Sequence, residues 1–133
     1  MKIIDLCLVQ SVVEGNSINP KNGQVLNDED FNWFGSSMLD SAKINGCRIE
    51  LCANLFGRDN ITTFLSSNVA QENFIKNVIW LLKMRNADGV NLDFELMPGN
   101  LSDEFVVFVA KLRKRLVKEL PMATVSLAIP AVD

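Results

Sequence analysis

One stretch of this 133-residue chain, Ala87-Asp88-Gly89-Val90-Asn91-Leu92-Asp93-Phe94-Glu95, indicates how the rest is arranged. Apolar and polar residues alternate in it, which is typical of a β-strand whose two faces meet different surroundings. Isolated carboxylates are costly away from water, so one amide and two carboxylates on a single strand face indicate a functional site. The apolar face, which would pack beneath helices, carries Val90, Leu92 and Phe94, and the polar face carries Asn91, Asp93 and Glu95.

Glu95 and Asp93 are suited to acid catalysis. Glu95 is the last residue of the row, so it would lie nearest to the carboxyl end of the strand, where parallel barrels build their active sites. Asp93 lies two residues earlier on the same face, and neighbouring carboxyl groups tend to share one proton. Two neighbouring carboxyl groups whose pKa values are pushed apart can act as a general acid and an ionised partner. We therefore expect Glu95 to be the acid and Asp93 its ionised neighbour.

The eight residues from Asp88 to Glu95 also resemble a known motif, the Asp-Gly-x-Asp-x-Asp-x-Glu signature of glycoside hydrolase family 18. This family includes chitinases, endo-β-N-acetylglucosaminidases and some cell-wall hydrolases. Asn91 stands where an Asp is usual. A second departure lies in the preceding strand, where Leu51-Cys52-Ala53-Asn54 stands in place of the common Ser-x-Gly-Gly.

The resemblance implies a retaining mechanism in which the substrate assists its own cleavage. Glu95 then resembles the general acid/base, and Asp93 the residue that orients the acetamido group of the sugar. Asn91 and Asp88 match supporting positions, where Asn91 can hydrogen-bond Asp93. The implied substrate is an oligo- or polysaccharide that contains β-1,4-linked N-acetylglucosamine, and no cofactor is implied.

The order of the predicted elements extends the resemblance over most of the chain. Strand patterns at residues 3–13, 47–55, 87–95 and 123–131 alternate with three long helix patterns. Strands joined by helical crossovers of this length lie parallel. A complete (β/α)₈ barrel has eight strands in about 250 residues. We therefore expect an α/β fold in which residues 1–133 form a partial family 18 barrel, roughly strands two to five, incomplete at both ends.

The strand at residues 47–55 has a polar face as well. Arg48 and Glu50 lie early on this face, where we expect them to pair inside the barrel below the site. Asn54 lies late on the same face, so it would reach the mouth of the barrel and contact substrate.

Residues that cap helices mark the expected helix starts. Asn27-Asp28, Ser67-Asn68 and Ser102 are such residues, and 56–60 reads as a loop. Trp33 falls in the first helix pattern, and we interpret it and its aromatic neighbours as core packing. The apolar positions of the first helix are Phe31, Phe34, Met38 and Ala42, and those of the last are Phe105, Phe108, Val109, Leu112, Leu116 and Leu120.

Composition excludes several classes of function. The net charge of −3 and the pI near 4.9 argue against a general nucleic-acid-binding surface. The basic cluster at residues 111–118 reads as the solvated end of a helix, where positive charge suits the macrodipole. No run of about 18 apolar residues is present, so no membrane span is expected. The chain has three cysteines and no histidine, which argues against zinc and excludes Ser-His-Asp or Cys-His catalysis within it.

The resemblance also implies parts that this chain does not contain. The family uses a Tyr on a later strand and a Trp on the last strand to hold the sugar. Here Tyr is absent, and Trp33 and Trp80 both fall in helix patterns. We therefore expect the chain alone to be inactive and the missing barrel half to lie in a parent chain. Polymeric substrates suggest a secreted parent, but no signal segment is recognisable, so the compartment stays open.

Three alternatives remain. The polar row could be an ordinary strand end, or a Mg²⁺ or Ca²⁺ site, although no further ligands are found nearby. The protein could also be a carbohydrate-binding relative that has lost catalysis, which Asn91 and the altered second strand allow. Among enzymes, the sequence does not separate a chitinase from an endo-β-N-acetylglucosaminidase or a cell-wall hydrolase.

Overall fold

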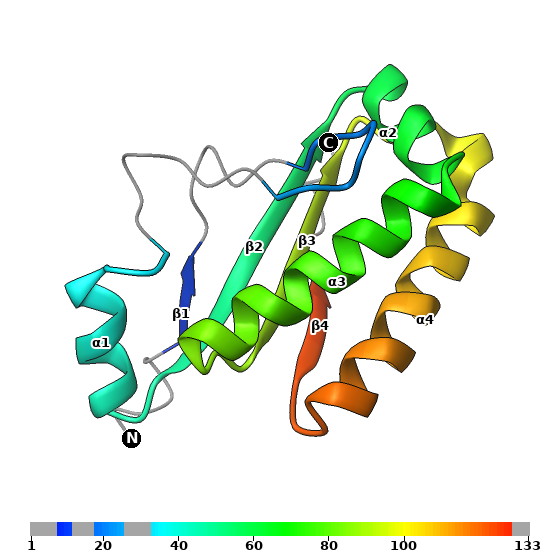
Figure 1. Cartoon of the computed structure of the whole chain (residues 1–133). Helices are drawn as coiled ribbons and strands as arrows, with labels where there is room; N and C mark the ends of the chain where they lie inside the picture. Colours follow the sequence, from blue (N-terminus) through cyan, green and yellow to red (C-terminus); the bar gives the residue numbers. More distant parts are fainter. Residues whose placement is uncertain (1–7, 12–17, 26–32, 129–133) are drawn as a thin grey trace.

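The structure is a computed structural model that describes residues 8–11, 18–25 and 33–128. Strands and helices alternate along the chain (Figure 1). The strands are β1 (Leu8–Ser11), β2 (Arg48–Phe56), β3 (Gly89–Glu95) and β4 (Thr124–Leu127). The helices are α1 (Ser37–Ile44), α2 (Arg58–Leu65), α3 (Asn68–Arg85) and α4 (Ser102–Glu119), with a short 3₁₀ turn, η2, at Gly99–Leu101.

The four strands form one parallel sheet in the order β1-β2-β3-β4. Each strand therefore pairs with the next one along the chain, and helices make the connections, which is the arrangement of a (β/α) barrel. The longest pairing joins β2 to β3 and runs from Glu50 opposite Gly89 to Phe56 opposite Glu95. The predicted partial barrel with about four parallel strands is confirmed.

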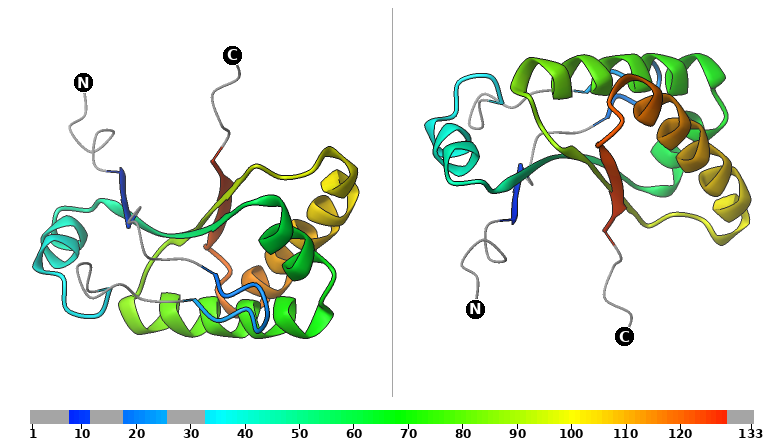
Figure 2. Two further views of the ribbon diagram at one scale, coloured as in Figure 1. Left: turned by 90° about the horizontal axis from the view of Figure 1, so that it is seen from above. Right: turned by 90° about the horizontal axis from the view of Figure 1, so that it is seen from below.

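The hydrophobic core lies between one face of the sheet and the helices. Figure 2 shows α3 and α4 on the same side of the sheet, while no helix of the described residues covers its other face. Phe94 of β3 enters a ring cluster, with ring centroids 5.9 Å from Phe64 of α2 and 6.1 Å from Phe108 of α4. Val90 and Leu92 are also buried on this side, so the predicted alternation of β3 is confirmed.

Helix α3 begins and ends where the sequence predicts. Its N-cap is Ser67, whose Oγ accepts a hydrogen bond from the Ala70 amide at 3.1 Å. Its C-cap is Asn86, which takes the left-handed conformation with φ of 52°. Such caps satisfy backbone groups that have no partner within the helix. In α4, the predicted apolar stripe is also confirmed, with Phe108, Leu112 and Leu116 fully buried.

The predicted start of the first helix is wrong. Helix α1 begins at Ser37 because Ser36 caps it, its Oγ accepting from the Leu39 amide at 3.4 Å. Phe34 lies in a turn before the helix and is 43% exposed, and Met38 faces solvent too. Trp33 also lies in this turn, yet it is core as predicted: it is 1% exposed and its Nε1 donates to the Leu81 carbonyl at 3.0 Å. The expected cap at Asn27-Asp28 and Phe31 lie outside the described residues.

Two further local predictions are wrong. Residues 58–60 are helical instead of loop, because α2 begins directly after Gly57, whose φ of 97° turns the chain out of β2. Ser102 does not cap α4 with its side chain. Its Oγ donates to the Gly99 carbonyl at 2.9 Å, because the short η2 turn already leads the chain into the helix.

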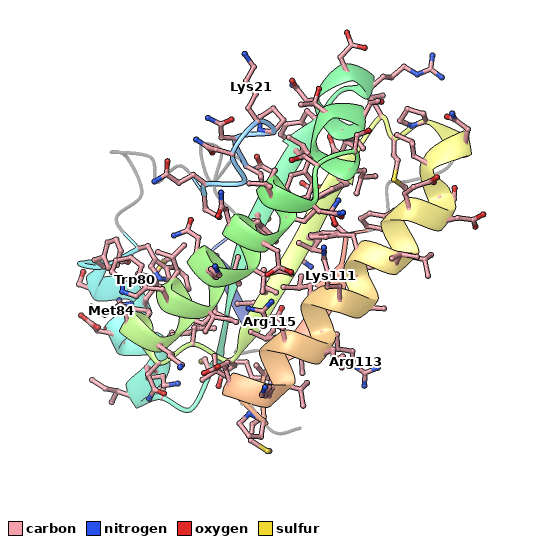
Figure 3. All side chains as sticks on the ribbon, turned by 45° about the vertical axis from the view of Figure 1, so that its right-hand side comes forward. Lys21, Trp80, Met84, Lys111, Arg113 and Arg115 are labelled. Atoms are coloured by element: carbon pink, nitrogen blue, oxygen red, sulfur yellow. The ribbon has the colours of Figure 1, made fainter. Side chains whose placement is uncertain are left out.

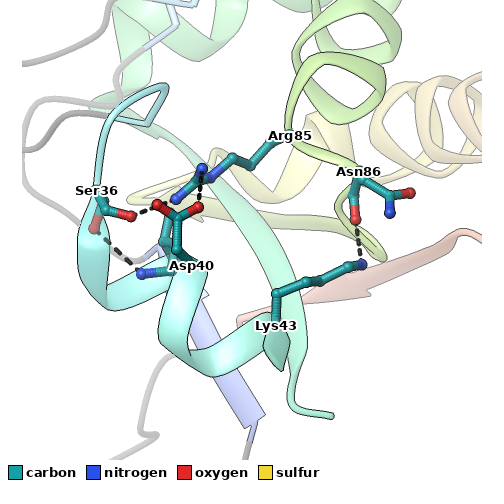
Figure 4. Close-up of polar contacts among 6 residues, drawn as sticks. Ser36, Asp40, Lys43, Arg85 and Asn86 are labelled. Atoms are coloured by element: carbon teal, nitrogen blue, oxygen red, sulfur yellow. Dashed lines mark hydrogen bonds and ion pairs between the residues drawn. The ribbon is translucent and has the colours of Figure 1, made fainter. Parts of the chain in front are cut away.

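A set of polar contacts fastens α1 to the C-terminal end of α3 (Figure 4). Arg85 makes an ion pair with Asp40 at 2.7 Å and donates to the Ser36 carbonyl at 2.5 Å. Lys43 donates to the Asn86 carbonyl. The Arg85 side chain is largely buried, so one enclosed guanidinium joins the start of α1 to the end of α3.

No helix of the described residues is long and apolar enough to cross a membrane.

A glycine at the first position of β3 is required by close packing. A Cβ at Gly89 would lie 2.4 Å from the Thr124 carbonyl oxygen of β4. We therefore expect Gly89→Ala to lower the free energy of unfolding by about 1–3 kcal/mol, as overpacked cores do. Urea denaturation followed by circular dichroism would measure this loss. Gly99→Ala is the matched control, because a Cβ there meets nothing within 4 Å; equal stabilities of the two variants would contradict the packing argument.

Candidate active site

The face of the sheet without helices carries polar side chains in layers. Residues paired in register in a parallel sheet point to the same side, so the pairing groups them directly. The lowest layer contains Glu50, Gly89 and Thr124, the middle layer Cys52, Asn91 and Ser126, and the upper layer Asn54 and Asp93, with Glu95 beyond them opposite Phe56.

In the lowest layer, Thr124 joins the two charged residues of β2. Arg48 Nη2 donates to Thr124 Oγ1 at 2.8 Å, and that hydroxyl donates to Glu50 Oε1 at 3.2 Å. Glu50 is buried and Arg48 is exposed. The expected pairing of Arg48 with Glu50 is therefore realised through a bridging hydroxyl, which the sequence did not indicate.

In the middle layer, Asn91 Nδ2 donates to Ser126 Oγ at 2.8 Å. This contact directs the amide of Asn91 sideways to β4, whereas the resemblance had suggested Asp93 as a hydrogen-bond partner that Asn91 can reach. Ser126 was not predicted to be a site residue. The signal that could have indicated it is the alternation of the small residues Thr124 and Ser126 with apolar residues along β4. Cys52 is buried beside this layer, and its burial together with the Asp93 charge raises the pKa of the thiol to about 11.

Glu95 and Asp93 are close neighbours at the carboxyl end of β3, and both are half-buried. Partial removal of Glu95 from water raises the pKa of this carboxyl above its ordinary value, and the charge of Asp93 and a hydrogen bond with it act in the same direction. These causes disfavour the ionised form of Glu95, so this carboxyl keeps its proton to a higher pH than an isolated Glu would.

The backbone around Glu95 is fixed on both sides. Its carbonyl accepts a hydrogen bond from the Gly57 amide at 3.1 Å. The next residue, Leu96, has a left-handed φ of 62° and is mostly exposed. A left-handed non-glycine residue is strained and is found where the surrounding structure requires it. The chain thus turns away immediately after Glu95 and leaves its carboxyl group at the edge of the sheet.

Asn54 lies beside Asp93 in the upper layer. Its side chain is buried, and its Oδ1 has no hydrogen-bond partner among the described residues. An unsatisfied buried carbonyl oxygen costs about 1–3 kcal/mol. Asn54 therefore lies at the carboxyl end of the sheet next to the carboxylates, as predicted. Its Oδ1 is an acceptor without a donor among the described residues.

Asp88 lies apart from the other predicted residues. At the amino end of β3, its Oδ2 accepts from the Ile49 amide at 2.7 Å and its Oδ1 lies 3.8 Å from Lys43 Nζ. Asp88 thus fixes the start of β3 against β2. The structure brings Asn54, Asn91, Asp93 and Glu95 to one face and places Asp88 at the opposite end of that strand.

The chemistry available at this face is proton transfer. Glu95, whose raised pKa favours the protonated form, can donate a proton at the strand end, with the carboxyl group of Asp93 beside it. In the part of the chain that the structure describes, no group of three or more His, Cys, Asp and Glu side chains is placed to hold a metal ion.

Comparisons with solved structures return proteins of one kind. A Bacillus subtilis protein described as a sporulation-specific glycosylase, ydhD, superposes with a TM-score of 0.76 at 22% identity over 90% of this chain. A class V chitinase from Pseudomonas fluorescens superposes with a TM-score of 0.77 at 18% identity over 93% of it. The spore cortex-lytic enzyme SleL of Bacillus megaterium gives 0.74 at 19% identity over 86%.

The chain is shorter than any of these similar proteins. It spans 39% of the Bacillus subtilis protein, 37% of the chitinase and 26% of SleL. No family model and no curated protein sequence matches the chain. The structural likeness establishes the fold: this chain is folded as one part of the α/β barrel that these chitinases and cortex-lytic enzymes possess.

The raised pKa of Glu95 can be measured directly. We expect the pKa of Glu95 to lie above the ordinary value for Glu, and Asp93→Asn to lower it because a neighbouring negative charge is removed. Part of the upward shift should remain, since partial desolvation is its largest cause. Carboxyl ¹³C shifts followed against pH would measure both values.

Asp103→Asn is the control for that titration, because Asp103 is an exposed acid in the first turn of α4. It should leave the pKa of Glu95 unchanged. An equal pKa of Glu95 in the wild type and in Asp93→Asn would show that the two carboxyl groups do not interact.

Proposed function

We propose that this chain is part of a family 18 glycoside hydrolase and supplies the general acid/base for hydrolysis of β-1,4 linkages in glycans that contain N-acetylglucosamine. The observation that carries the proposal is the Glu95–Asp93 pair at the carboxyl end of β3, where partial desolvation and the charge of Asp93 raise the pKa of Glu95. The barrel fold shared with chitinases and cortex-lytic enzymes supports it.

The proposed reaction has two steps. Glu95 donates its proton to the glycosidic oxygen as the bond to the anomeric carbon breaks, and the acetamido oxygen of the same sugar attacks that carbon. Asp93, ionised, accepts a hydrogen bond from the acetamido N–H and so directs the oxygen and offsets the positive charge of the oxazolinium ring. Glu95, now a carboxylate, takes a proton from water, which attacks the anomeric carbon and restores the acetamido group.

The neutral residues of the middle layer suit this division of roles. Asn91 carries no charge, so it does not add to the repulsion that Asp93 already exerts on Glu95. Its hydrogen bond to Ser126 holds it in place. Burial keeps Cys52 beside it in the protonated form, because its thiol pKa lies near 11. Glu95 is then the group of this row that gives and takes the proton during the reaction, with Asp93 as its charged neighbour.

We propose that residues 1–133 correspond to part of a catalytic barrel, with the sugar-binding pocket completed by the other part in a parent chain. The chain spans 26–39% of the three similar proteins and contains no Tyr. The resemblance to family 18 assigns a Tyr and a Trp of later strands to the pocket.

A second candidate is a carbohydrate-binding protein that retains the barrel without catalysis. Asn91, which replaces an acidic residue of the motif, and Cys52-Ala53-Asn54, which differs from the common glycine pair, favour it. Tight binding of a chitooligosaccharide by the complete protein without any cleavage would select this candidate.

The acid role of Glu95 is tested in the complete protein. We expect Glu95→Gln to lower kcat on an N-acetylglucosamine oligomer by about a hundredfold or more, because a general acid contributes about 10²–10⁴ in rate. Binding should persist, since the amide keeps the size of the carboxyl group. Glu104→Gln on the exposed first turn of α4 is the control, and near wild-type turnover by Glu95→Gln would refute the assignment.

The chain by itself should not hydrolyse the same oligomer at a detectable rate, because the acid is present without the pocket that positions the sugar. Product analysis by mass spectrometry of purified chain, with a complete family enzyme as positive control, checks this. Hydrolysis by the chain that disappears in Glu95→Gln would show that 133 residues suffice.

A further inference from the structure

The outer surface formed by α3 and α4 carries a strong excess of basic side chains. We call it the α3–α4 basic face. It contains six cations and two anions: Lys76, Lys83, Lys111, Lys114, Arg115 and Lys118 with Glu72 and Glu119. Two further exposed acids, Asp103 and Glu104, lie beyond it in the first turn of α4.

The first anion, Glu72 of α3, is surrounded by three of these cations. Arg115 Nη1 lies 2.6 Å from Glu72 Oε2. The pKa of Glu72 is lowered chiefly by this hydrogen bond, and Lys111 and Lys76 lower it further by their charge. Lys76 and Lys111 therefore lie close to a carboxylate that is already paired with Arg115.

The second anion, Glu119 at the end of α4, is also paired with a cation of the face. Lys83 Nζ of α3 lies 2.9 Å from Glu119 Oε2. The hydrogen bond and charge of Lys83 lower the pKa of Glu119, and Lys118 and Arg115 contribute as well. Arg115 acts on both carboxylates, so the charges form one continuous surface in which the cations outnumber the anions.

Helix geometry separates this surface from the rest of α4. Lys111, Lys114, Arg115 and Lys118 recur at spacings of three and four residues, so they lie on one side of the helix. Figure 3 shows Lys111 and Arg115 on the side of α4 that faces α3, and Arg113 on the other side.

The excess charge is not explained by the fold alone. The helix macrodipole favours cations in the last turn of α4, where only Lys118 is basic. Lys76 lies in the middle of α3, and Lys111 and Lys114 precede the last turn of α4. Like charges at i, i+3 and i, i+4 repel each other in the free protein. The whole chain has a net charge of −3, so the basic face is a local feature against an acidic background.

We propose that the α3–α4 basic face binds an anionic glycan, a polysaccharide that carries carboxylate or phosphate groups along its length. Repeated negative groups complement a surface on which cations recur along two adjacent helices. The polymer would lie on the helix layer, on the opposite side of the sheet from Glu95. That the anion is a glycan rests on the proposed function.

The test measures binding of the 133-residue chain to polygalacturonate, a carboxylate-bearing polysaccharide, with uncharged dextran as the control ligand. We expect binding to polygalacturonate only, and a loss of affinity between 50 and 200 mM salt of about tenfold or more. The variant Lys76→Gln/Lys114→Gln/Lys118→Gln leaves the Arg115–Glu72 and Lys83–Glu119 pairs intact. It should bind about tenfold or more weakly than the wild type.

The matched control is Lys21→Gln/Arg58→Gln/Arg113→Gln, which removes three exposed cations outside the face. It has the same net charge as the first variant, and we expect wild-type affinity. Equal losses in the two triple variants would attribute binding to overall charge and overturn the proposal, as would an absence of binding to polygalacturonate.

Binding of random-sequence duplex DNA of similar length is measured as well. Tighter binding of this DNA than of polygalacturonate, with the same loss in the first variant, would assign the face to nucleic acid and overturn the glycan proposal. The measurement is independent of the catalytic assignment, because Glu95→Gln should bind polygalacturonate as the wild type does. A failure of the catalytic proposal can therefore be told apart from a failure of the glycan-binding proposal.

Discussion

The pairing of β2 with β3 is the constraint on which the rest of the structure depends. Its register sets Asn54 opposite Asp93 and Leu55 opposite Phe94. One set of residues enters the aromatic core beneath the helices, and the other set forms the polar layers. A shift by one residue would exchange the faces, and carboxylates would then enter the core around Phe64. The fold and the candidate site are therefore specified together.

The polar layers differ in how completely their hydrogen bonds are made. In the lower layers, Thr124 joins Arg48 to Glu50, and Ser126 accepts from Asn91. Towards the carboxyl end, the pKa of Glu95 is raised beside Asp93, and the Oδ1 of Asn54 lacks a partner among the described residues. Satisfied networks stabilise a sheet, whereas groups with perturbed pKa values or missing partners are typical of sites that act on a ligand.

Local patterns in the sequence account for much of this structure. The alternation in β3 predicted its two faces, and Ser67 and Asn86 marked the ends of α3, because a strand pattern and a helix cap each depend on a few neighbouring residues. Helix α2 was missed since its eight residues follow Gly57 too closely for a helical period to be recognised. The bond from Asn91 to Ser126 spans 35 residues, and only the register of three strands brings them together. The positions of Asp93 and Glu95 on one face followed from spacing alone, but the partial desolvation that is the largest cause of the raised Glu95 pKa required the structure.

The most direct test of the proposed chemistry is a crystal structure of the complete protein carrying Glu95→Gln with an uncleaved N-acetylglucosamine oligomer. The proposal predicts the glycosidic oxygen within about 2.6–3.2 Å of the side chain at position 95. It also predicts that the acetamido N–H of the adjoining sugar donates to Asp93. An oligomer that lies elsewhere on the barrel, with neither contact, would contradict the assignment of this face as the active site.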